Sequence, residues 1–426
     1  MRVAVIGAGI VGVTTAFELA RDGQKVTVFE RRASVAEEAS FGHAGLLSTA
    51  DMCAWASASL TTTLVRQLTG RPGALQLARP WSGLPLAWLW RYWRARSAEQ
   101  LLANHQRLHR LASYSQGRMQ TLAAELELGH EQSQGCLVLL RSAGDLAAAR
   151  NGLKLMTDLG LPFELVDAQQ ARQLEPGLNP HMALHAAVHL PQAGVGNCRE
   201  FAHLLRAQAQ LLGARFQFQR MVLGITAGPE PVVRHAGSQP DSPVLQEEFD
   251  AVVICAALGS ADLLRPFGLR LPLAAVHGHT ITAPLQQVDQ QRHGGPRSAV
   301  LDERHQVTIS RLGDRVRVSG GTELGGPLRQ PRETTIKRLY KVLDDWYPGC
   351  AQMSKLQRWT GARPSLPDGP PLVCASTVPG VWLNLGHGGN GWALACGSAR
   401  VLADQVAGRS AEIDTEGLTL SRLSPA

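Results

Sequence analysis

Short apolar runs alternate with helical periodicity at the start of the chain. Residues 3–6 form an apolar run typical of a buried strand, and apolar positions between Val13 and Ala20 recur at the spacing of a helix. A second apolar run covers 25–29 and ends on the acidic residue Glu30. This order predicts a strand–helix–strand unit, the repeating element of a parallel sheet.

The turn between the first strand and the helix is rich in glycine. Residues 7–12 read GAGIVG, and this spacing between a strand and a helix is the fingerprint of a dinucleotide site. Gly7 makes the tight turn, Gly9 admits a pyrophosphate close to the backbone, and Gly12 allows the helix to pack near the strand. Glu30 is expected to accept hydrogen bonds from ribose hydroxyls and to disfavour a 2′-phosphate. The segment predicts a Rossmann-like nucleotide-binding unit.

A second glycine-rich turn lies near the C-terminus. An apolar run at 381–385 leads into Gly386-His387-Gly388-Gly389-Asn390-Gly391-Trp392, and a helical pattern follows from about 393 to 406. One dinucleotide needs a single pyrophosphate cradle. A second positive helix end is better suited to a ring that becomes anionic on reduction, as an isoalloxazine does. The pair of turns therefore favours FAD over a nicotinamide cofactor.

The segments between the two turns change repeatedly between helix and strand. Helical periodicity covers 98–128, 145–159, 198–212 and 332–346. Short strand patterns cover 135–141, 163–166, 186–190, 215–218, 221–225 and 250–258, and a further group, typical of an antiparallel sheet, covers 279–282, 306–310 and 315–319.

We therefore predict an α/β protein of two intertwined domains, since 426 residues exceed what a single core usually holds. The first is a Rossmann-like FAD-binding domain over 1–52, 193–272 and 356–426. The second is a discontinuous α+β substrate domain, built on an antiparallel sheet, over 53–192 and 273–355.

The net charge of +7 is concentrated in one region. Residues 52–110 contain eight arginines, one glutamate and no lysine, so the rest of the chain sums to zero. An acidic partner would therefore meet one part of the surface. No nucleic-acid-binding motif accompanies the charge, which disfavours nucleic acid as that partner.

Within this region, residues 79–96 are rich in tryptophan and arginine. Leu86, Leu89, Trp90 and Trp93 share one face of a predicted helix, with Arg91 and Arg94 on the other side. Such a helix either packs on its own domain or lies on an anionic membrane. The second alternative predicts a peripheral protein on the inner face of the cell membrane that passes electrons to a quinone.

The spacing of the cysteines and histidines disfavours disulfides and metal sites, and the length of the apolar stretches disfavours membrane spans. The seven cysteines include no C-x-x-C pair, which indicates a reducing, cytoplasmic compartment. No apolar stretch is long enough for a transmembrane helix. The histidine pairs His105/His109 and His185/His189 have the spacing of metal ligands but no third partner, so we expect no metal.

Five segments of the chain carry a family likeness: the Gly7–Glu30 unit, Ser40–Leu47, the strand that ends at Gly259, residues 360–369 (TGARPSLPDG) and residues 386–388 (GHG). Together they resemble FAD-dependent D-amino acid dehydrogenases, of the wider D-amino acid oxidase and glycine oxidase group. The resemblance implies that Ala44-Gly45-Leu46 border the flavin ring and that Val222 contacts the adenine side. It also implies that His387–Trp392 line the pyrimidine end of the flavin, and that Arg363 binds the substrate carboxylate.

The fingerprint and the resemblance together give a set of candidate FAD-binding residues. They are Gly7, Gly9, Ile10, Val11, Gly12, Glu30, Arg31, Ser40, His43, Ala44, Gly45, Leu46, Leu47, Val222, Gly259, His387, Gly388, Gly389, Asn390, Gly391 and Trp392.

The expected reaction moves a hydride from the substrate Cα to flavin N5, and water then hydrolyses the imino acid to a 2-oxo acid and ammonia. A bidentate arginine fixes a carboxylate in plane, which makes Arg363 the first candidate catalytic residue. His279 and His305 occupy positions where the family often has pocket tyrosines, and His43 stands where it often has asparagine. His279 and His305 are therefore candidates for shaping or protonating the site.

Two alternatives remain open from the sequence. One is an oxidase of the same fold that uses O₂ to oxidise glycine, sarcosine or a cyclic imino acid. The other is a non-catalytic nucleotide-binding or membrane-associated module.

Overall fold

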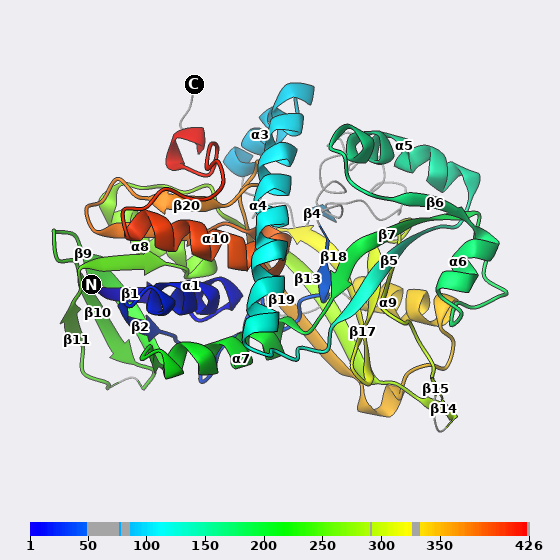
Figure 1. Ribbon diagram of the computed structural model, residues 1–426, viewed down its shortest axis with the longest axis horizontal. Helices are drawn as coiled ribbons and strands as arrows, with labels where there is room; N and C mark the ends of the chain where they lie inside the picture. The colour runs from blue at the N-terminus through cyan, green and yellow to red at the C-terminus, as the bar shows by residue number, and fades with distance from the viewer. Residues whose placement is uncertain (49–75, 78–85, 240, 290–291, 326–332, 424–426) are drawn as a thin grey trace.

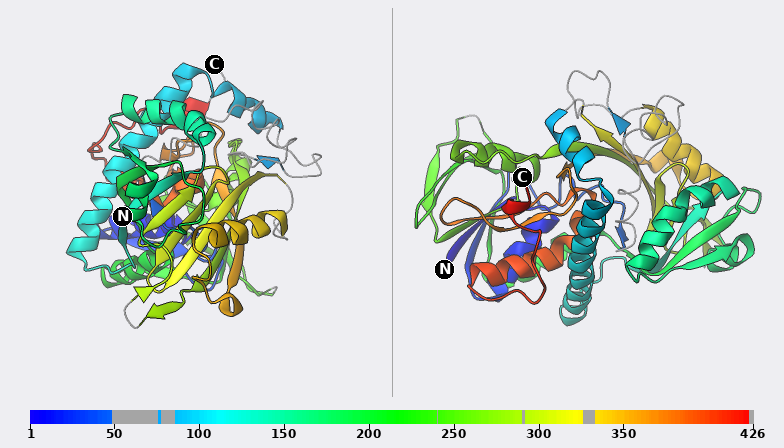
Figure 2. Two further views of the ribbon diagram at one scale, coloured as in Figure 1. Left: turned by 90° about the vertical axis from the view of Figure 1, so that its right-hand side faces the viewer. Right: turned by 90° about the horizontal axis from the view of Figure 1, so that it is seen from above.

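The computed structural model describes residues 1–48, 76–77, 86–239, 241–289, 292–325 and 333–423. Two lobes lie side by side, each built on its own sheet, and one long helix runs along their junction (Figures 1 and 2). The first part of the segment 79–96, residues 79–85, lies outside the described residues.

The first lobe contains a six-stranded sheet in the order β20-β21-β12-β1-β2-β8. All neighbours are parallel except β20 and β21. The strands are β1 (Arg2–Ile6), β2 (Lys25–Phe29), β8 (Arg215–Gln217), β12 (Ala251–Ile254), β20 (Leu372–Ala375) and β21 (Val381–Leu385). The strand–helix–strand unit predicted for 3–30 is confirmed, because β1 and β2 flank helix α1 (Ile10–Arg21).

Both faces of this sheet are covered, which explains why its strands are apolar throughout rather than alternating. Helices α1, α7 (Cys198–Leu211) and α10 (Gly391–Val406) share one core with Val3, Val5 and Val28. The opposite face packs against a three-stranded sheet through Ile225 and Val233. The strands of this smaller sheet are β9 (Arg220–Thr226), β10 (Val232–Gly237) and β11 (Leu245–Glu248). A short helix, α8 (Ser260–Leu264), follows β12.

The second lobe is built on a ten-stranded sheet whose main path runs β19-β13-β18-β17-β16-β5-β7-β3, with β4 and β6 at its side. Its long strands are β5 (Ser133–Leu140), β7 (Ala186–Val195), β13 (Ala274–Pro284), β17 (Val307–Leu312), β18 (Arg315–Leu324) and β19 (Gln357–Ser365). Its short strands are β3 (Leu46–Leu47), β4 (Gln76–Leu77), β6 (Glu164–Asp167) and β16 (Ala299–Asp302). Most neighbours are antiparallel, as predicted, and β16–β5 is a parallel pair.

Helix α9 (Glu333–Trp346) shares a core with β13, β17 and β18. The remaining elements of this lobe are α5 (Ala143–Asp158), α6 (Ala168–Leu174), β14 (Gln287–Asp289) and β15 (Arg292–His293).

The lobes interlock more than the predicted domain ranges indicate. Strands β3 and β19 belong to the second sheet, although 1–52 and 356–426 were expected in the FAD-binding domain. Helix α4 (Ala98–Glu125) was expected in the substrate domain, yet Leu111 and Leu122 pack in the core of the first lobe. Long-range strand pairing and helix packing decide these borders, and neither is visible in local periodicity.

A buried ion cluster joins α1, α4 and α10. Glu18 is fully buried and accepts from Arg118 at 2.7 and 2.8 Å and from Arg400 at 2.8 Å. Arg400 also pairs with Asp22 and Asp404. Because one buried carboxylate accepts hydrogen bonds from arginines of two other helices, it fixes how these helices pack in the first lobe.

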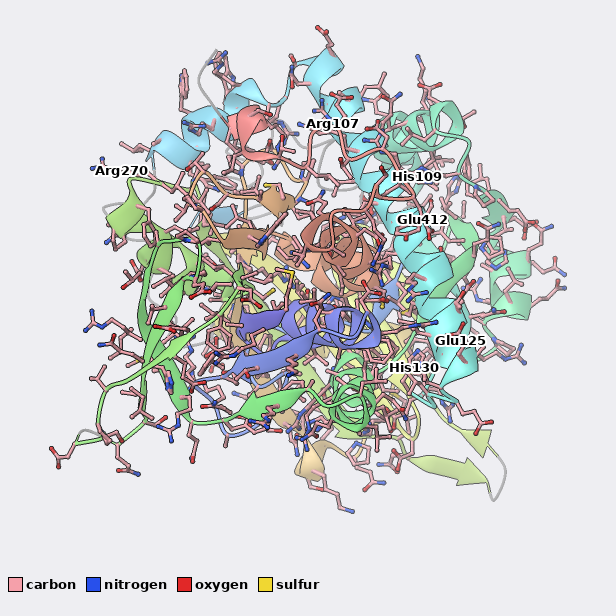
Figure 3. The ribbon with its side chains drawn as sticks, turned by 60° about the vertical axis from the view of Figure 1, so that its left-hand side comes forward. Arg107, His109, Glu125, His130, Arg270 and Glu412 are labelled. Atoms are coloured by element: carbon pink, nitrogen blue, oxygen red, sulfur yellow. The ribbon has the colours of Figure 1, made fainter. Side chains whose placement is uncertain are left out.

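We predict that Glu18→Ala lowers the free energy of unfolding by about 3–5 kcal/mol, because two guanidinium groups lose a buried partner. Glu125→Ala is the matched control, since its ion pair with Arg21 also joins α4 to α1 but lies at the surface (Figure 3). The control should cost about 0–1 kcal/mol. Urea denaturation followed by tryptophan fluorescence measures both, and equal losses would contradict the role given to Glu18.

Candidate functional site

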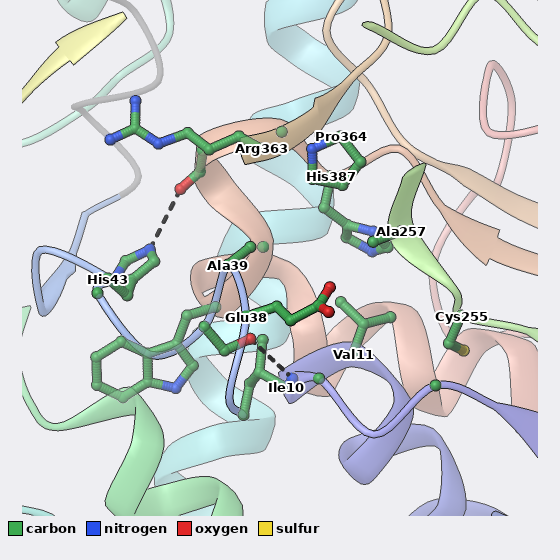
Figure 4. Close-up of a pocket in the computed structure, with 18 of the residues that line it drawn as sticks. Ile10, Val11, Glu38, Ala39, His43, Cys255, Ala257, Arg363, Pro364 and His387 are labelled. Atoms are coloured by element: carbon green, nitrogen blue, oxygen red, sulfur yellow. Dashed lines mark hydrogen bonds between the residues drawn. The ribbon is translucent and has the colours of Figure 1, made fainter. Parts of the chain in front are cut away.

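A cavity of about 460 Å³ lies between the two lobes (Figure 4). Its walls come from the β1–α1 turn, the segment 37–48, β9, the β12–α8 turn, β18, β19 and the β21–α10 turn. The C-terminal ends of the parallel strands open into it, as expected for a ligand site in a Rossmann-like sheet.

The β1–α1 turn forms a cradle that only glycine backbone can make. Gly7 has φ +102°, and a Cβ there would come within 2.7 Å of the Cys255 carbonyl oxygen. A Cβ on Gly12 would lie 1.9 Å from the Gly7 carbonyl oxygen. The amide of Ile10 donates to Ser40 Oγ at 3.0 Å, so the segment after β2 folds back onto the start of α1. The backbone shape therefore suits a pyrophosphate at the helix N-terminus.

Glu30 lies at the end of β2 beside this cradle. Its carboxylate accepts the backbone amides of Ala8 at 2.7 Å and Arg32 at 2.8 Å, and burial raises its pKa. Arg31 lines the same cavity but is engaged by Glu38, which accepts from its guanidinium at 2.9 and 2.6 Å.

Four consecutive carbonyls of residues 41–44 are held by polar side chains of the second sheet. Arg317 donates to the carbonyls of Phe41 at 3.4 Å and His43 at 2.9 Å. Thr280 donates to the Gly42 carbonyl at 2.9 Å and Ser310 to the Ala44 carbonyl at 2.6 Å. Arg317 is 7% exposed, and burial lowers its pKa to about 10, so it stays charged at neutral pH.

His43 connects this segment with the β21–α10 turn. The Gly45 amide donates to Nδ1 at 3.2 Å, so Nε2 carries the proton and donates to the Gly389 carbonyl at 3.2 Å (Figure 4). Burial and the nearby Arg363 lower the pKa of His43 to about 4. His387, with Nε2 3.1 Å from Ser398 Oγ, has its pKa lowered to about 3 by burial. Both imidazoles are therefore neutral at physiological pH.

The guanidinium of Arg363 lies close to the backbone of β13 and β18. A Cβ on Gly278 would come within 2.5 Å of its Nη2, and its Nη1 donates to the Gly321 carbonyl at 3.3 Å. We call Gly278, Gly320 and Gly321 the glycine floor. A β-bulge between β13 and β18 falls here: Gly320 pairs with His279 and Glu323 with His277, which leaves Gly278 opposite two residues.

The cavity contains most of the residues that the sequence predicted. Arg363, His305 and eighteen of the candidate cofactor residues line it. Among the described residues of that set, Gly12, Gly45 and Leu47 lie behind the cavity wall, where Gly12 allows close helix packing and Leu47 pairs with β7.

His279 differs from the expectation. It is 2% exposed and lies outside the cavity lining, with Nδ1 2.9 Å from Thr360 Oγ1 and Nε2 3.6 Å from Glu323 Oε1. The bulge beside it changes the alternation of side chains along β13, so the side chain of this histidine contacts β18 and β19 and does not line the cavity.

Sequence reasoning missed two groups of residues that shape the cavity. Thr280, Ser310 and Arg317 hold the segment 41–44 from strands far away in sequence. Trp359 lines the cavity, and a Cβ on Gly42 or Gly361 would come within 1.9 or 2.1 Å of its ring. The only local signal for Trp359 is its position four residues before Arg363.

Within the described ranges, no three His, Cys, Asp or Glu side chains gather as a metal site would require. His105 is buried, whereas His109 lies 3.2 Å from Ser113 (Figure 3). Among the described helices, none is both long and apolar enough to cross a membrane.

Comparison with known proteins identifies the family. The model of the FAD-dependent oxidoreductase family DAO matches residues 2–405. The chain belongs to this family. A D-amino acid dehydrogenase of Rhodopseudomonas palustris (strain HaA2) is 36% identical over 431 residues, which cover 99% of this chain and 98% of the relative.

Two solved structures share the fold of this chain. Glycine oxidase from Geobacillus kaustophilus matches with a TM-score of 0.73 and 20% identity, over 99% of both chains. L-proline dehydrogenase from P. horikoshii matches with a TM-score of 0.71 and 17% identity, over 99% of this chain and 97% of the other. The predicted α/β fold is therefore confirmed.

The chain is an FAD-dependent oxidoreductase, and the cavity fits this cofactor. The backbone cradle at Gly7 suits the pyrophosphate and Glu30 the ribose. The N-terminus of α10, where no described side chain caps the helix, suits a ring system that becomes anionic.

We predict that Arg317→Leu weakens FAD binding about 10- to 100-fold. The variant removes charge-assisted hydrogen bonds, worth about 1.5–3 kcal/mol each, from two carbonyls of the cofactor-side segment. Fluorescence titration of apoprotein with FAD measures the affinity. Arg315→Leu on the same strand is the control, because Arg315 pairs with Glu131 instead. Unchanged affinity in Arg317→Leu would show that the segment holds its shape without Arg317.

Proposed function

We propose that the protein catalyses FAD-dependent oxidative deamination of D-amino acids to 2-oxo acids and ammonia. The observation that carries this proposal is Arg363 in the cavity wall, with its guanidinium against the glycine floor. A carboxylate is the ligand that matches a guanidinium bidentately. The similarity to a D-amino acid dehydrogenase over nearly the whole chain supports the same substrate class.

Bound FAD supplies an acceptor for the two electrons that leave Cα as a hydride. The residues of this chain position the substrate, which is the main contribution that a protein makes to such a reaction. Arg363 fixes the carboxylate, and the small residues beneath it allow the substrate to lie close to the sheet. The neutral His43 and His387 add no positive charge that would compete with Arg363 for the carboxylate.

An oxidase of the same fold is the second candidate, because a glycine oxidase is among the structural neighbours. The two functions differ in the electron acceptor and in the size of the substrate. Release of peroxide in air with glycine or sarcosine would favour the oxidase, whereas reduction of a quinone or dye with larger D-amino acids favours the dehydrogenase.

We predict that D-amino acids, and not their L-enantiomers, bleach the flavin absorbance of the purified protein under anaerobic conditions. Arg363→Leu should lower kcat/KM about 10²-fold or more, because the carboxylate loses its charged partner. Gly278→Ala should also lower kcat/KM, by about 10²-fold, since the methyl group displaces the guanidinium. FAD content should stay unchanged in both variants.

Gly224→Ala provides the control for this series. Gly224 also lies in a strand, and a Cβ there meets no atom within 4 Å. If Arg363→Leu retained wild-type kcat/KM for D-amino acids, the proposed role of Arg363 would be wrong.

We further propose that helix α3 (Leu86–Arg94) places the enzyme on an anionic membrane surface. Three of the four residues of the predicted apolar face point outward: Leu86 is 74% exposed, Trp90 53% and Trp93 62%, whereas Leu89 packs against the core. The helix packs inward through Trp88 and Tyr92 instead, whose rings stack at 5.2 Å. An outward aromatic face beside an arginine is the composition of an interfacial helix.

The arginines of this helix have different roles. Arg94 is exposed and lies 4.9 Å from the Trp90 ring centroid. Arg91 donates to the Leu423 carbonyl at 2.8 Å, and Arg96 donates to the Tyr92 hydroxyl at 2.5 Å. Arg94 is therefore the residue of the three best placed to meet lipid phosphates.

A second, smaller cavity of about 80 Å³ lies behind α3. Trp88, Tyr92 and Arg96 line one side, and residues 387–390 line the other and also border the large cavity. This arrangement supports a membrane quinone as the electron acceptor, because the β21–α10 turn borders both cavities.

We predict that the double variant Trp90→Gln/Trp93→Gln loses binding to vesicles that contain anionic lipid, since both indoles would otherwise enter the interface. Flotation of the purified protein with such vesicles measures binding. Leu211→Gln is the control, because Leu211 is 81% exposed on helix α7. Equal flotation of all three proteins would exclude α3 as the membrane contact.

A further inference from the structure

His305 lies in the turn between β16 and β17 and faces the large cavity. Its side chain is 18% exposed, and Nδ1 lies 3.0 Å from Asp302 Oδ1. The backbone amide of His305 donates to the same oxygen at 2.9 Å. The Asp302 carboxylate therefore holds both the backbone and the imidazole of His305 in place.

Asp302 is fully buried and remains ionised. Arg141 donates to its Oδ2 from Nε at 2.7 Å, and Trp346 donates from Nε1 at 2.7 Å. Despite its burial, the hydrogen bonds from His305 and Trp346 and the charge of Arg141 lower the pKa of Asp302 to about 2. A carboxylate accepts and does not donate, so Nδ1 of His305 carries the hydrogen.

This tautomer leaves the lone pair of Nε2 available. Among the described residues, no hydrogen-bond partner of Nε2 is found. An imidazole whose Nδ1–H is held by a buried carboxylate is a proton acceptor oriented in one direction, as in hydrolytic triads.

His305 and Arg363 border the same stretch of β18. Val307 pairs with Gly320, so the turn before Val307 runs beside Gly321 and Thr322. Gly321 is the residue whose carbonyl accepts from Arg363. Gly320, Gly321 and Thr322 line the same cavity as both side chains. A small zwitterion bound to Arg363 would therefore share this cavity with His305.

We propose that His305, oriented by Asp302, accepts a proton from the ammonium group of the substrate. This inference rests on the proposed function, because amino acids arrive mainly as ammonium ions and hydride loss from Cα requires the neutral amine. The proton moves from the substrate nitrogen to Nε2, which yields a neutral amine and an imidazolium beside Asp302. The imidazolium returns its proton to water after the product leaves. His305 is the catalytic residue, and Asp302 is a positioning residue.

Several charged groups surround this pair. Arg141 contacts Asp302 and also pairs with Asp345 of α9 at 2.8 Å. Arg338 of α9 and Arg363 of β19 line the same cavity as His305. On the turn itself, Arg304 pairs with Asp145, and Glu303 is the remaining charged residue. Asp302 is the one described carboxylate that contacts His305.

The test compares pH profiles of kcat/KM for a D-amino acid between pH 6 and pH 10. His305→Gln should lower kcat/KM about 10²-fold at neutral pH, the usual contribution of a general base. The loss should shrink as pH rises, because the substrate amine then loses its proton in solution. Added imidazole should restore part of the activity, and FAD absorbance should report an intact site.

Asp302→Asn should give a smaller loss, about tenfold, with the same recovery at high pH. Asp345→Asn is the matched control, because it removes a carboxylate from Arg141 without touching His305. It should keep the wild-type profile.

The results distinguish a failure of the proposed proton transfer from a failure of the proposed function. If the wild-type protein oxidises D-amino acids but His305→Gln lowers kcat/KM equally at all pH values without imidazole rescue, the imidazole only shapes the site and the proposal is overturned. If no D-amino acid reduces the wild-type flavin, the proposed function itself fails, and the proton transfer with it.

Discussion

The segment 41–44 depends on the second sheet for its position, and the cofactor cavity depends on that segment. Its four carbonyls point to Thr280, Ser310 and Arg317, each of which comes from a different strand. A buried guanidinium is costly to desolvate, and here the cost is offset by carbonyls that would otherwise lack donors. Formation of the antiparallel sheet is therefore a condition for the cofactor wall and not only for the substrate wall. This coupling explains why strands and helices from both predicted domains interlock.

The sequence allowed prediction of those parts of the site that depend on local backbone. The β1–α1 cradle follows from glycine spacing over a few residues, and the β21–α10 turn was recognised in the same way. Arg317 could not be predicted, because the His43 carbonyl that it binds lies 274 residues away. Ser310 and Thr280 act over 266 and 238 residues. Contacts of this length require the strand order, which periodicity does not contain.

Two differences between prediction and structure have physical causes of the same kind. His279 was expected in the pocket from its position in the resemblance, but a bulge beside it changes which side chains of β13 face the cavity. In α3, the periodicity separated apolar from basic positions correctly, but it could not show which face packs inward. Trp88 provides the anchor, because its Nε1 donates to the Ser365 carbonyl at 3.0 Å. Tertiary contacts, and not the amphipathic pattern alone, decide the orientation of such a helix.

The charges of the cavity form a consistent arrangement for an anionic ligand. His43 lies close to Arg363 and Arg317, and both cations together with burial keep it neutral. If His43 were charged, three positive groups would repel one another in a buried space. Its neutral form instead bridges the Gly45 amide and the Gly389 carbonyl, and so joins two walls without adding charge. The carboxylate that contacts His305, Asp302, is fully buried behind the imidazole and does not face the cavity directly. Under the proposed function, the cavity would separate Arg363, which binds the carboxylate, from His305, which accepts the proton, and a zwitterionic substrate requires this division.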